Sequence, residues 1–334
     1  MKAIHFKDYG ELKPNIIIKE LPLPVPTQDE VLVKVHAASV NPVDFKLVQG
    51  ALKVLHRFKL PARLGFDLSG TIESIGANVK EFKVGDKVYA RAGDFTPGTF
   101  AEYYAIESKY VAIKPSNLSY EEASCIPLVG QTSVQAITDI GNAKPGQKIL
   151  IHAGSGGIGV FAIQYAKSLG LFVATTTSTQ NVEWVKSLGA DLVIDYKKQN
   201  YLDMIKDYDL VYDTLGGKIK SDSLNVLKPG AKLISIVGPP DRKFAIERKL
   251  SFIVRTFLTL VNLKVQWLAK RKKVSYHYLL MESKGSQLAE ITKIIEAGKI
   301  KVYIDKIYPL EDTLGALEHV KAGRTKGKVV VKMS

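Results

Sequence analysis

The chain has 334 residues, of which 46% are hydrophobic, and this length suits two globular domains better than one. A single cysteine, Cys125, excludes an internal disulfide framework and a multi-cysteine metal site. The formal net charge of +14 favours anionic partners, but no zinc-finger spacing or aromatic-rich RNA motif accompanies it, so we expect no nucleic-acid partner. The chain starts directly with a strand-like segment and has no uncharged apolar run of about eighteen residues, so we expect a cytoplasmic protein without a membrane-spanning segment.

The first 121 residues predict a mostly β domain. Val31, Val33 and Val35 recur at every second position, so they share one face of a strand. Similar strand-like segments fall at 1–6, 16–20, 30–39, 68–74, 87–90 and 100–106. Several short strands separated by turns, without intervening helices, are typical of a partly open β-barrel.

The pattern changes at Ser119, which with Glu122 forms a capping-box start for a helix. Strand-like segments then fall at 149–152, 171–176, 192–194, 209–213, 232–237 and 276–281, with helical patterns between several of them. This alternation predicts an α/β domain built on a doubly wound parallel sheet. A helix at 287–297 and a last strand at 328–332 plausibly return to the first domain. We therefore expect a β-rich domain at 1–121 and 284–334, and a second domain at 122–283.

A glycine-rich turn at 153–159 joins the apolar strand before it to an amphipathic helix after it. Its glycines fit the spacing G-x-G-x-x-G, with Gly154 for the sharp turn, Gly156 for close approach to a pyrophosphate and Gly159 for helix–sheet packing. The helix start adds free N–H groups and partial positive charge. The sequence thus predicts a dinucleotide site of the Rossmann type. We expect the whole turn to bind: Gly154, Ser155, Gly156, Gly157, Ile158 and Gly159.

The loop at 175–181 indicates which dinucleotide binds. A site for NADH places an acidic residue at the end of the second strand, about twenty residues past the first glycine. This chain has only hydroxyl and amide side chains there, and its first acid is Glu183. Such groups can hydrogen-bond a 2′-phosphate that a carboxylate would repel, so NADPH is favoured over NADH. The alternative is a polar loop with no preference between the two.

Residues 248–273 mix aromatic and aliphatic residues with lysines and arginines, ending in four consecutive basic residues from Lys270 to Lys273. A basic amphipathic helix can lie on an anionic membrane surface. Such a segment more commonly covers a cleft or packs at a subunit interface, so peripheral membrane contact is not the favoured interpretation.

The order of these parts resembles that of the medium-chain dehydrogenase/reductase superfamily, in particular its zinc-free NADPH:quinone oxidoreductase and enone reductase branch. The resemblance covers nearly the whole chain. It is carried by VNPVDFK at 40–46, GFDLSG at 65–70, VGDKVYA at 84–90, PLVGQTS at 127–133, AGSGGIG at 153–159, SLGADLVIDY at 187–196, DTLGG at 213–217 and GRTKGKVVVK at 323–332. It implies a GroES-like β-rich catalytic domain beside the Rossmann domain. Where zinc alcohol dehydrogenases have Cys, His and Cys, this chain has Asn41, Phe66 and Leu128, which cannot replace those ligands; we therefore expect no zinc.

The same resemblance implies site residues. It places Asn41 and Thr132 near the nicotinamide as catalytic polar groups. Lys46 is either a proton donor or an ordinary surface lysine. All six histidines and Cys125 are interpreted as structural. The implied cofactor-binding residues beyond the glycine turn are Thr177, Ser178, Asn181, Tyr196, Thr214, Leu215, Val237, Gly238, Leu279, Met281 and Lys328.

Without a metal, the expected reaction is one for which hydride donation nearly suffices: NADPH-dependent reduction of a quinone or of an α,β-unsaturated carbonyl (enone). The alternative is a non-catalytic NADPH-binding redox sensor, docked on a membrane through 248–273. Related reductases often dimerise through the edge of the Rossmann sheet, so we expect a homodimer formed through 276–281.

Overall fold

The computed structural model describes residues 1–53, 56–93 and 95–333, which form two compact units. The first unit is Met1–Gln131 together with Glu282–Ser334, and the second is Thr132–Met281. The boundaries thus fall at Gln131 and Glu282, whereas the sequence placed them at 121 and 284. We describe each unit separately.

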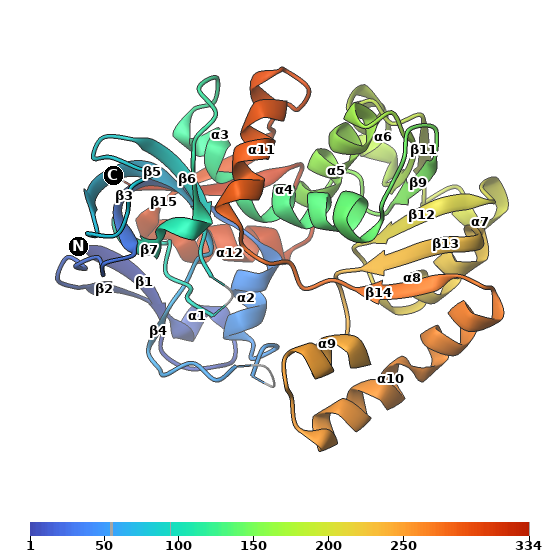
Figure 1. The fold of residues 1–334 in the computed structure, drawn as a ribbon, viewed down its shortest axis with the longest axis horizontal. Coiled ribbons are helices and arrows are strands. Elements are labelled where there is room, and N and C mark those ends of the chain that lie inside the picture. The colour runs from blue at the N-terminus through green and yellow to red at the C-terminus, as the bar shows by residue number, and fades with distance from the viewer. Residues whose placement is uncertain (54–55, 94, 334) are drawn as a thin grey trace. The chain divides into compact units, whose positions relative to one another are not determined.

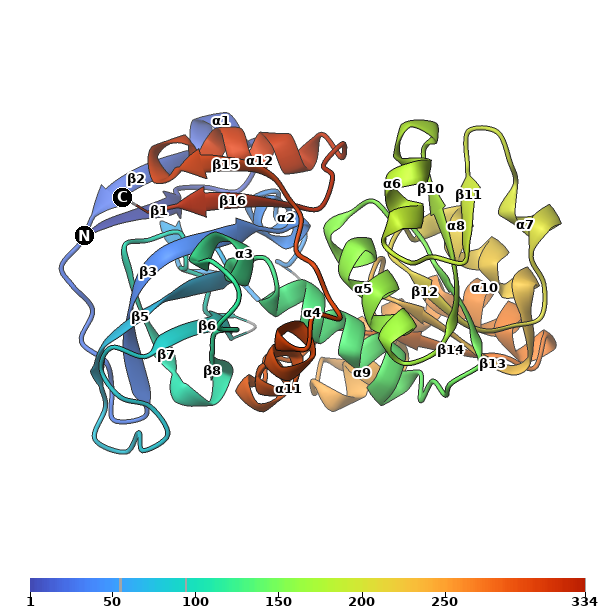
Figure 2. The same ribbon diagram turned by 90° about the horizontal axis from the view of Figure 1, so that it is seen from above.

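Two sheets make up most of the first unit (Figures 1 and 2). A three-stranded antiparallel sheet has the order β2 (Ile16–Glu20), β1 (Lys2–Phe6), β4 (Ala62–Arg63). The larger sheet has the order β15 (Ile304–Pro309), β16 (Lys328–Lys332), β3 (Glu30–Val40), β5 (Asp67–Ile75), β6 (Lys87–Arg91), β8 (Val111–Ile113), and β7 (Tyr103–Glu107) also pairs with β3. The valines that alternate along β3, from Val31 to Val35, are buried in the core of this unit.

The last strand of the chain returns to the first unit, as the sequence predicted. β16 runs antiparallel to β3, with Val329 opposite Val40. This register places Lys328 beside Asn41, the residue that follows β3, although the two are 287 positions apart in the chain.

The helices of the first unit are short. They are α1 (Leu12–Asn15), α2 (Pro42–Val48), α3 (Tyr120–Ser124), α4 (Pro127–Val134), which runs to the unit boundary, α11 (Gly285–Glu296) and α12 (Thr313–Lys321). The predicted capping box before α3 is confirmed, because Ser119 Oγ accepts from the Glu122 amide at 3.1 Å and Glu122 Oε2 accepts from the Ser119 amide at 2.8 Å. Strand β15 and helices α2 and α12 were not predicted.

The second unit is the predicted doubly wound parallel sheet with helices. Its six strands have the order β11 (Leu192–Asp195), β10 (Phe172–Thr177), β9 (Lys148–Ile151), β12 (Tyr208–Asp213), β13 (Leu227–Ser235), β14 (Ser275–Tyr278). Its α-helices are α5 (Gly157–Ser168), α6 (Val182–Ser187), α7 (Tyr201–Met204), α8 (Gly217–Ser223), α9 (Arg242–Glu247) and α10 (Phe252–Arg271). The chain order reverses between β9 and β12, and in such sheets ligands bind at the carboxyl ends of the strands beside this switch point.

Helix α10 packs against α9 and β14 (Figure 1). Among the described residues it is the one helix long and apolar enough to cross a membrane by length and composition alone. The sequence predicted no membrane-spanning segment because the chain has no uncharged apolar run of that length. Helix α10 is long and apolar enough only if the charged Arg255 and Lys264 inside it are accepted.

Candidate active site

Asn41 directly follows strand β3 and caps helix α2, whose first residue is Pro42. The backbone N–H of Asn41 donates to Asp44 Oδ2 at 2.7 Å, which fixes the start of the helix. Asp44 is completely buried, and this burial raises the pKa of its carboxyl to about 7. Asp44 therefore orders the local turn, and its burial makes ionisation of its carboxyl unfavourable.

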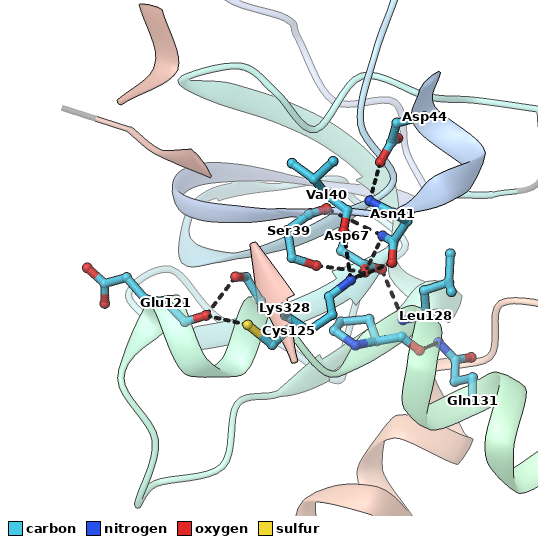
Figure 3. Close-up of polar contacts among 12 residues, drawn as sticks. Ser39, Val40, Asn41, Asp44, Asp67, Glu121, Cys125, Leu128, Gln131 and Lys328 are labelled. Atoms are coloured by element: carbon cyan, nitrogen blue, oxygen red, sulfur yellow. Dashed lines mark hydrogen bonds and ion pairs between the residues drawn. The ribbon is translucent and has the colours of Figure 1, made fainter. Parts of the chain in front are cut away.

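The side chains of Asn41, Asp67 and Lys328 form a buried polar cluster (Figure 3). The Lys328 ammonium donates to Val40 O at 3.0 Å and to Asn41 Oδ1, and it lies 3.9 Å from Asp67 Oδ2. Asn41 Nδ2 donates to Asp67 Oδ2 at 2.8 Å. The amide of Asn41 is thus held by a cation on its oxygen and an anion on its nitrogen.

Asp67 is the centre of this cluster, and sequence reasoning did not single it out. Its Oδ2 also accepts from Ser39 Oγ at 3.0 Å, and its Oδ1 accepts from the Leu128 amide at 3.0 Å. Burial lowers the pKa of the Lys328 ammonium and raises the pKa of the Asp67 carboxyl, and each charge opposes the shift of the other. We refer to Asn41, Asp67 and Lys328 as the lysine cluster.

The donor set in the first unit does not fit zinc. Phe66, at one of the positions that would carry a ligand, is fully buried in the apolar core. The charged group beside Asn41 is the Lys328 ammonium, which cannot ligate a cation. The Cys125 thiol donates to Glu121 O at 3.3 Å, and burial raises its pKa to about 12, so it is not a ready thiolate. The described part of the chain holds no cluster of three His, Cys, Asp or Glu residues suited to a metal.

The glycine turn follows β9 in the second unit and leads into α5. A Cβ on Gly154 would lie 2.3 Å from Thr175 Oγ1, and one on Gly159 would lie 2.4 Å from Ala153 O, so packing alone demands glycine at both positions. A Cβ on Gly156 would meet nothing nearer than Ala153 O at 3.4 Å. Because the chain itself leaves room at Gly156, this glycine fits a surface that a ligand approaches closely.

Thr177, Ser178, Asn181 and Tyr196 are brought together where β10 and β11 end. The Tyr196 amide donates to Thr177 O at 3.1 Å, and Asn181 Nδ2 lies 3.3 Å from Ser178 Oγ. The side-chain oxygens of Thr177 and Asn181 are buried without a hydrogen-bond partner among the described residues. Buried polar atoms are nearly always paired, so these two fit a site that receives a polar ligand group.

One cation at this site was missed. Lys197 Nζ lies 5.3 Å from the centre of the Tyr196 ring, and its amide donates to Asp195 Oδ1 at 3.0 Å. The signal was present in the sequence as Lys197-Lys198 directly after Tyr196, but the resemblance carried over only the tyrosine.

The carboxyl ends of β12 and β13 hold four further predicted residues: Thr214, Leu215, Val237 and Gly238. Buried Asp213 organises them, because its carboxylate accepts from the Leu215 amide at 3.0 Å and from Ser235 Oγ at 2.7 Å. Thr214 Oγ1 donates to His152 O at 2.9 Å, so the loop after β12 is tied to the end of β9. These contacts fix one rim of the site.

Leu279 and Met281 are both buried after β14, and the Leu279 amide donates to Ser235 O at 2.9 Å. Sequence reasoning missed Lys220 of α8, a mostly buried lysine whose Nζ lies 3.3 Å from the Tyr276 hydroxyl. Nothing in the local sequence distinguishes it from the surface lysines around it.

The other candidates are placed as follows. Thr132 is buried in α4 and belongs to the second unit, whereas Asn41 and Lys328 belong to the first. Lys46 is exposed on α2. His152 contacts Thr176 Oγ1 at 3.2 Å and Ser223 Oγ at 2.9 Å, and burial lowers its pKa to about 4, so it is a neutral, structural histidine.

Comparison with known proteins agrees with this architecture. The chain matches the family described as alcohol dehydrogenase GroES-like domain over residues 27–116 and the family described as zinc-binding dehydrogenase over residues 188–331. It is 34% identical over 344 residues to 2-methylene-furan-3-one reductase of Solanum lycopersicum, covering 99% of this chain and 79% of that protein. It is 33% identical over 349 residues to the chloroplastic NADPH-dependent alkenal/one oxidoreductase of Arabidopsis thaliana, with the same two coverages. Among solved structures, the quinone oxidoreductase from Coxiella burnetii matches with a TM-score of 0.86 and 32% identity, covering 100% of this chain and 99% of that one.

Proposed function

Because the chain belongs to the quinone and enone reductase branch of the medium-chain dehydrogenase/reductase superfamily, we propose that it is a zinc-independent, NADPH-dependent oxidoreductase that reduces a quinone or an enone. One observation carries the proposal. The dinucleotide turn is complete, with an open face at Gly156, and the adjoining strand end offers Thr177 and Asn181 rather than a carboxylate.

The chain's own residues support NADPH in particular. A 2′-phosphate carries negative charge and needs hydrogen-bond donors. Thr177, Ser178 and Asn181 supply hydroxyls and an amide, Tyr196 a phenol, and Lys197 a cation. The backbone amides at the start of α5 would hold the pyrophosphate, and Thr214, Leu215, Val237 and Gly238 would border the nicotinamide half.

Bound NADPH supplies a hydride, so the protein has to position the acceptor, exclude water and manage one proton. Reduction of an enone also builds negative charge on the carbonyl oxygen, and a placed donor there lowers the barrier by about 3–4 kcal/mol. Asn41 and Thr132 are the proposed polar groups beside the nicotinamide, and Lys46 is the proposed proton donor. Leu279 and Met281 are proposed to flank the ring as apolar contacts that exclude water.

The lysine cluster supports reduction without zinc. Lys328 is a predicted cofactor-binding residue, and within the chain its ammonium contacts Val40, Asn41 and Asp67. The cation beside Asn41 polarises the amide, and this strengthens the hydrogen bond that Asn41 Nδ2 donates to Asp67 Oδ2. We propose that this internal cation takes the electrostatic place that a metal holds in zinc-dependent members of the superfamily.

The test is cofactor oxidation by the purified chain, with NADPH and NADH compared against one aromatic quinone and one small enone. We expect turnover with NADPH and little with NADH, unchanged by chelators. Tight NADPH binding without turnover of either acceptor would instead favour the redox sensor. Activity that is lost on chelation and restored by zinc would contradict zinc independence.

We also propose a homodimer formed through the sheet edge. β14 is an edge strand of the six-stranded sheet, and an edge strand is where a strand of a second copy can extend the sheet. Light scattering after size exclusion is expected to give twice the chain mass, and a proline in place of Tyr276 or His277 is expected to give monomers.

A further inference from the structure

Helix α10 exposes a row of large apolar side chains. Phe252 and Ile253 are 81% and 79% exposed, and Phe257, Leu260, Leu263 and Trp267 are each at least half exposed. With 3.6 residues per turn, these six positions lie on one side of the helix. We call them the outer face of α10. A contiguous apolar surface of this kind on a folded protein marks a site of interaction.

The opposite side of α10 is already used. Leu258, Val265 and Ala269 are buried, with the last two in the core beneath β13, and Asn262 Nδ2 donates to Pro240 O at 2.8 Å. A helix anchored in this way along its length cannot leave the second unit to cross a bilayer. A partner that covers the outer face therefore has to bind to α10 while the helix stays packed on the second unit.

Helix α10 and the chain segments directly before and after it carry charge of one sign. Residues 248–281 contain eight lysines and arginines and no aspartate or glutamate. Several flank the outer face: Lys264 lies between its apolar residues, Lys270 and Arg271 close the helix, and the Arg271 guanidinium lies 5.5 Å from the Trp267 ring centre. Apolar side chains rimmed by cations complement a surface that is itself apolar beneath and anionic above.

We propose that the outer face of α10 docks the protein peripherally on an anionic lipid bilayer. Phe252, Ile253 and Phe257 would insert at the level of the acyl-chain boundary, Trp267 would lie at the interface, and the basic rim would contact phosphate headgroups. The proposal does not depend on the reductase activity.

Other occupants are less well matched. A second copy related by two-fold symmetry would place two clusters of eight like charges against each other, which costs free energy. A nucleic acid would satisfy the charges but leave Phe252 and Ile253 in water. An anionic bilayer satisfies both features.

The experiment is sedimentation of the full chain with vesicles of phosphatidylcholine alone or with one third phosphatidylglycerol. We expect binding to the anionic vesicles, a loss of binding as salt screens the charges, and little binding to the neutral ones. Blue-shifted fluorescence of Trp267, measured in a Trp184→Phe background, should accompany binding.

Two variants separate the contribution of the apolar side chains to vesicle binding from that of the basic ones. Phe252→Ser/Ile253→Ser/Phe257→Ser should bind at least about tenfold more weakly, because it removes the inserted apolar area. Lys270→Gln/Arg271→Gln/Lys273→Gln should bind roughly a hundredfold more weakly at low salt. Matched controls are Leu23→Ser/Val25→Ser, two exposed apolar residues of the first unit, and Lys13→Gln/Lys80→Gln/Lys83→Gln, which removes equal charge elsewhere.

Unchanged binding of either α10 variant, or equal losses in the controls, would overturn the proposal. So would a dimer that the serine variant dissociates without any vesicle binding by the parent, since the face would then be a self-association surface. Each variant is first checked for an unchanged unfolding transition and unchanged NADPH binding.

Discussion

The ammonium of Lys328 donates to the side-chain oxygen of Asn41, and the nitrogen of the same amide donates to Asp67. A cation, an amide and an anion are thus linked in a region that water does not reach. If Lys328 or Asp67 is removed, the other keeps a buried charge without its partner, and this lowers the stability of the folded state.

We expect Lys328→Met to lower the free energy of unfolding by about 3–5 kcal/mol, because Asp67 then keeps an uncompensated buried charge. Adding Asp67→Leu should restore part of that loss. The matched control is Lys332→Met on the same strand. Lys332 is exposed, and its ion pair with the partly exposed Glu121 contributes at most about 1 kcal/mol. Urea unfolding of the four proteins tests this. A double variant no more stable than Lys328→Met would contradict the coupling.

Asp44 predicts a pH dependence of stability. Its pKa is about 7 when folded and near 3.8 when exposed, so the folded state binds more protons between these values. Stability from this group is complete below the unfolded pKa and is lost as the pH rises through about 7, by about 4 kcal/mol in all. Asp44→Asn keeps the acceptor for the Asn41 amide and should flatten the curve. The free energy of unfolding of both proteins is measured from pH 4 to pH 8. If it changes with pH in the same way in both, the pH dependence does not come from Asp44.

The elements set by local pattern could be predicted from the sequence. The glycine turn, the capping box at Ser119 and the six strands of the second unit depend on neighbouring residues, and the structure contains them all. Helix α2 had a signal that was not used, since Asn41 followed by Pro42 is a usual helix start.

The lysine cluster could not be predicted in the same way. Lys328 and Asn41 meet only because β16 pairs with β3 in one register, and no local pattern encodes a contact across 287 positions. Asp67 stands beside apolar Phe66 and Leu68 in a strand, where an acid is indistinguishable from a surface residue until the partners are known.

Two glycines of the turn should respond differently to substitution. Gly159→Ala forces a Cβ to within 2.4 Å of a carbonyl oxygen, so the chain without cofactor should be destabilised. Gly156→Ala has room within the chain and a φ of −78°, so stability should change by less than about 0.5 kcal/mol while NADPH binding falls about tenfold or more. Unfolding without cofactor and NADPH titration by fluorescence separate the two. If Gly156→Ala binds NADPH with full affinity, the pyrophosphate does not bind against Gly156.

Selectivity for NADPH should reside in the group around Tyr196. Lys197 is exposed and close to the tyrosine ring, beside which we propose that the 2′-phosphate binds. We expect Lys197→Ala to weaken NADPH binding by about tenfold and to leave NADH binding unchanged, because a charged hydrogen bond contributes about 1.5–3 kcal/mol when formed. Ser178→Asp should go further and favour NADH, since a carboxylate repels the phosphate and can accept from the ribose hydroxyls. Lys206→Ala, an exposed lysine of the same unit, is the control for net charge. Equal losses for NADPH and NADH in Lys197→Ala would place the 2′-phosphate elsewhere and leave the loop after β10 without a role in selectivity.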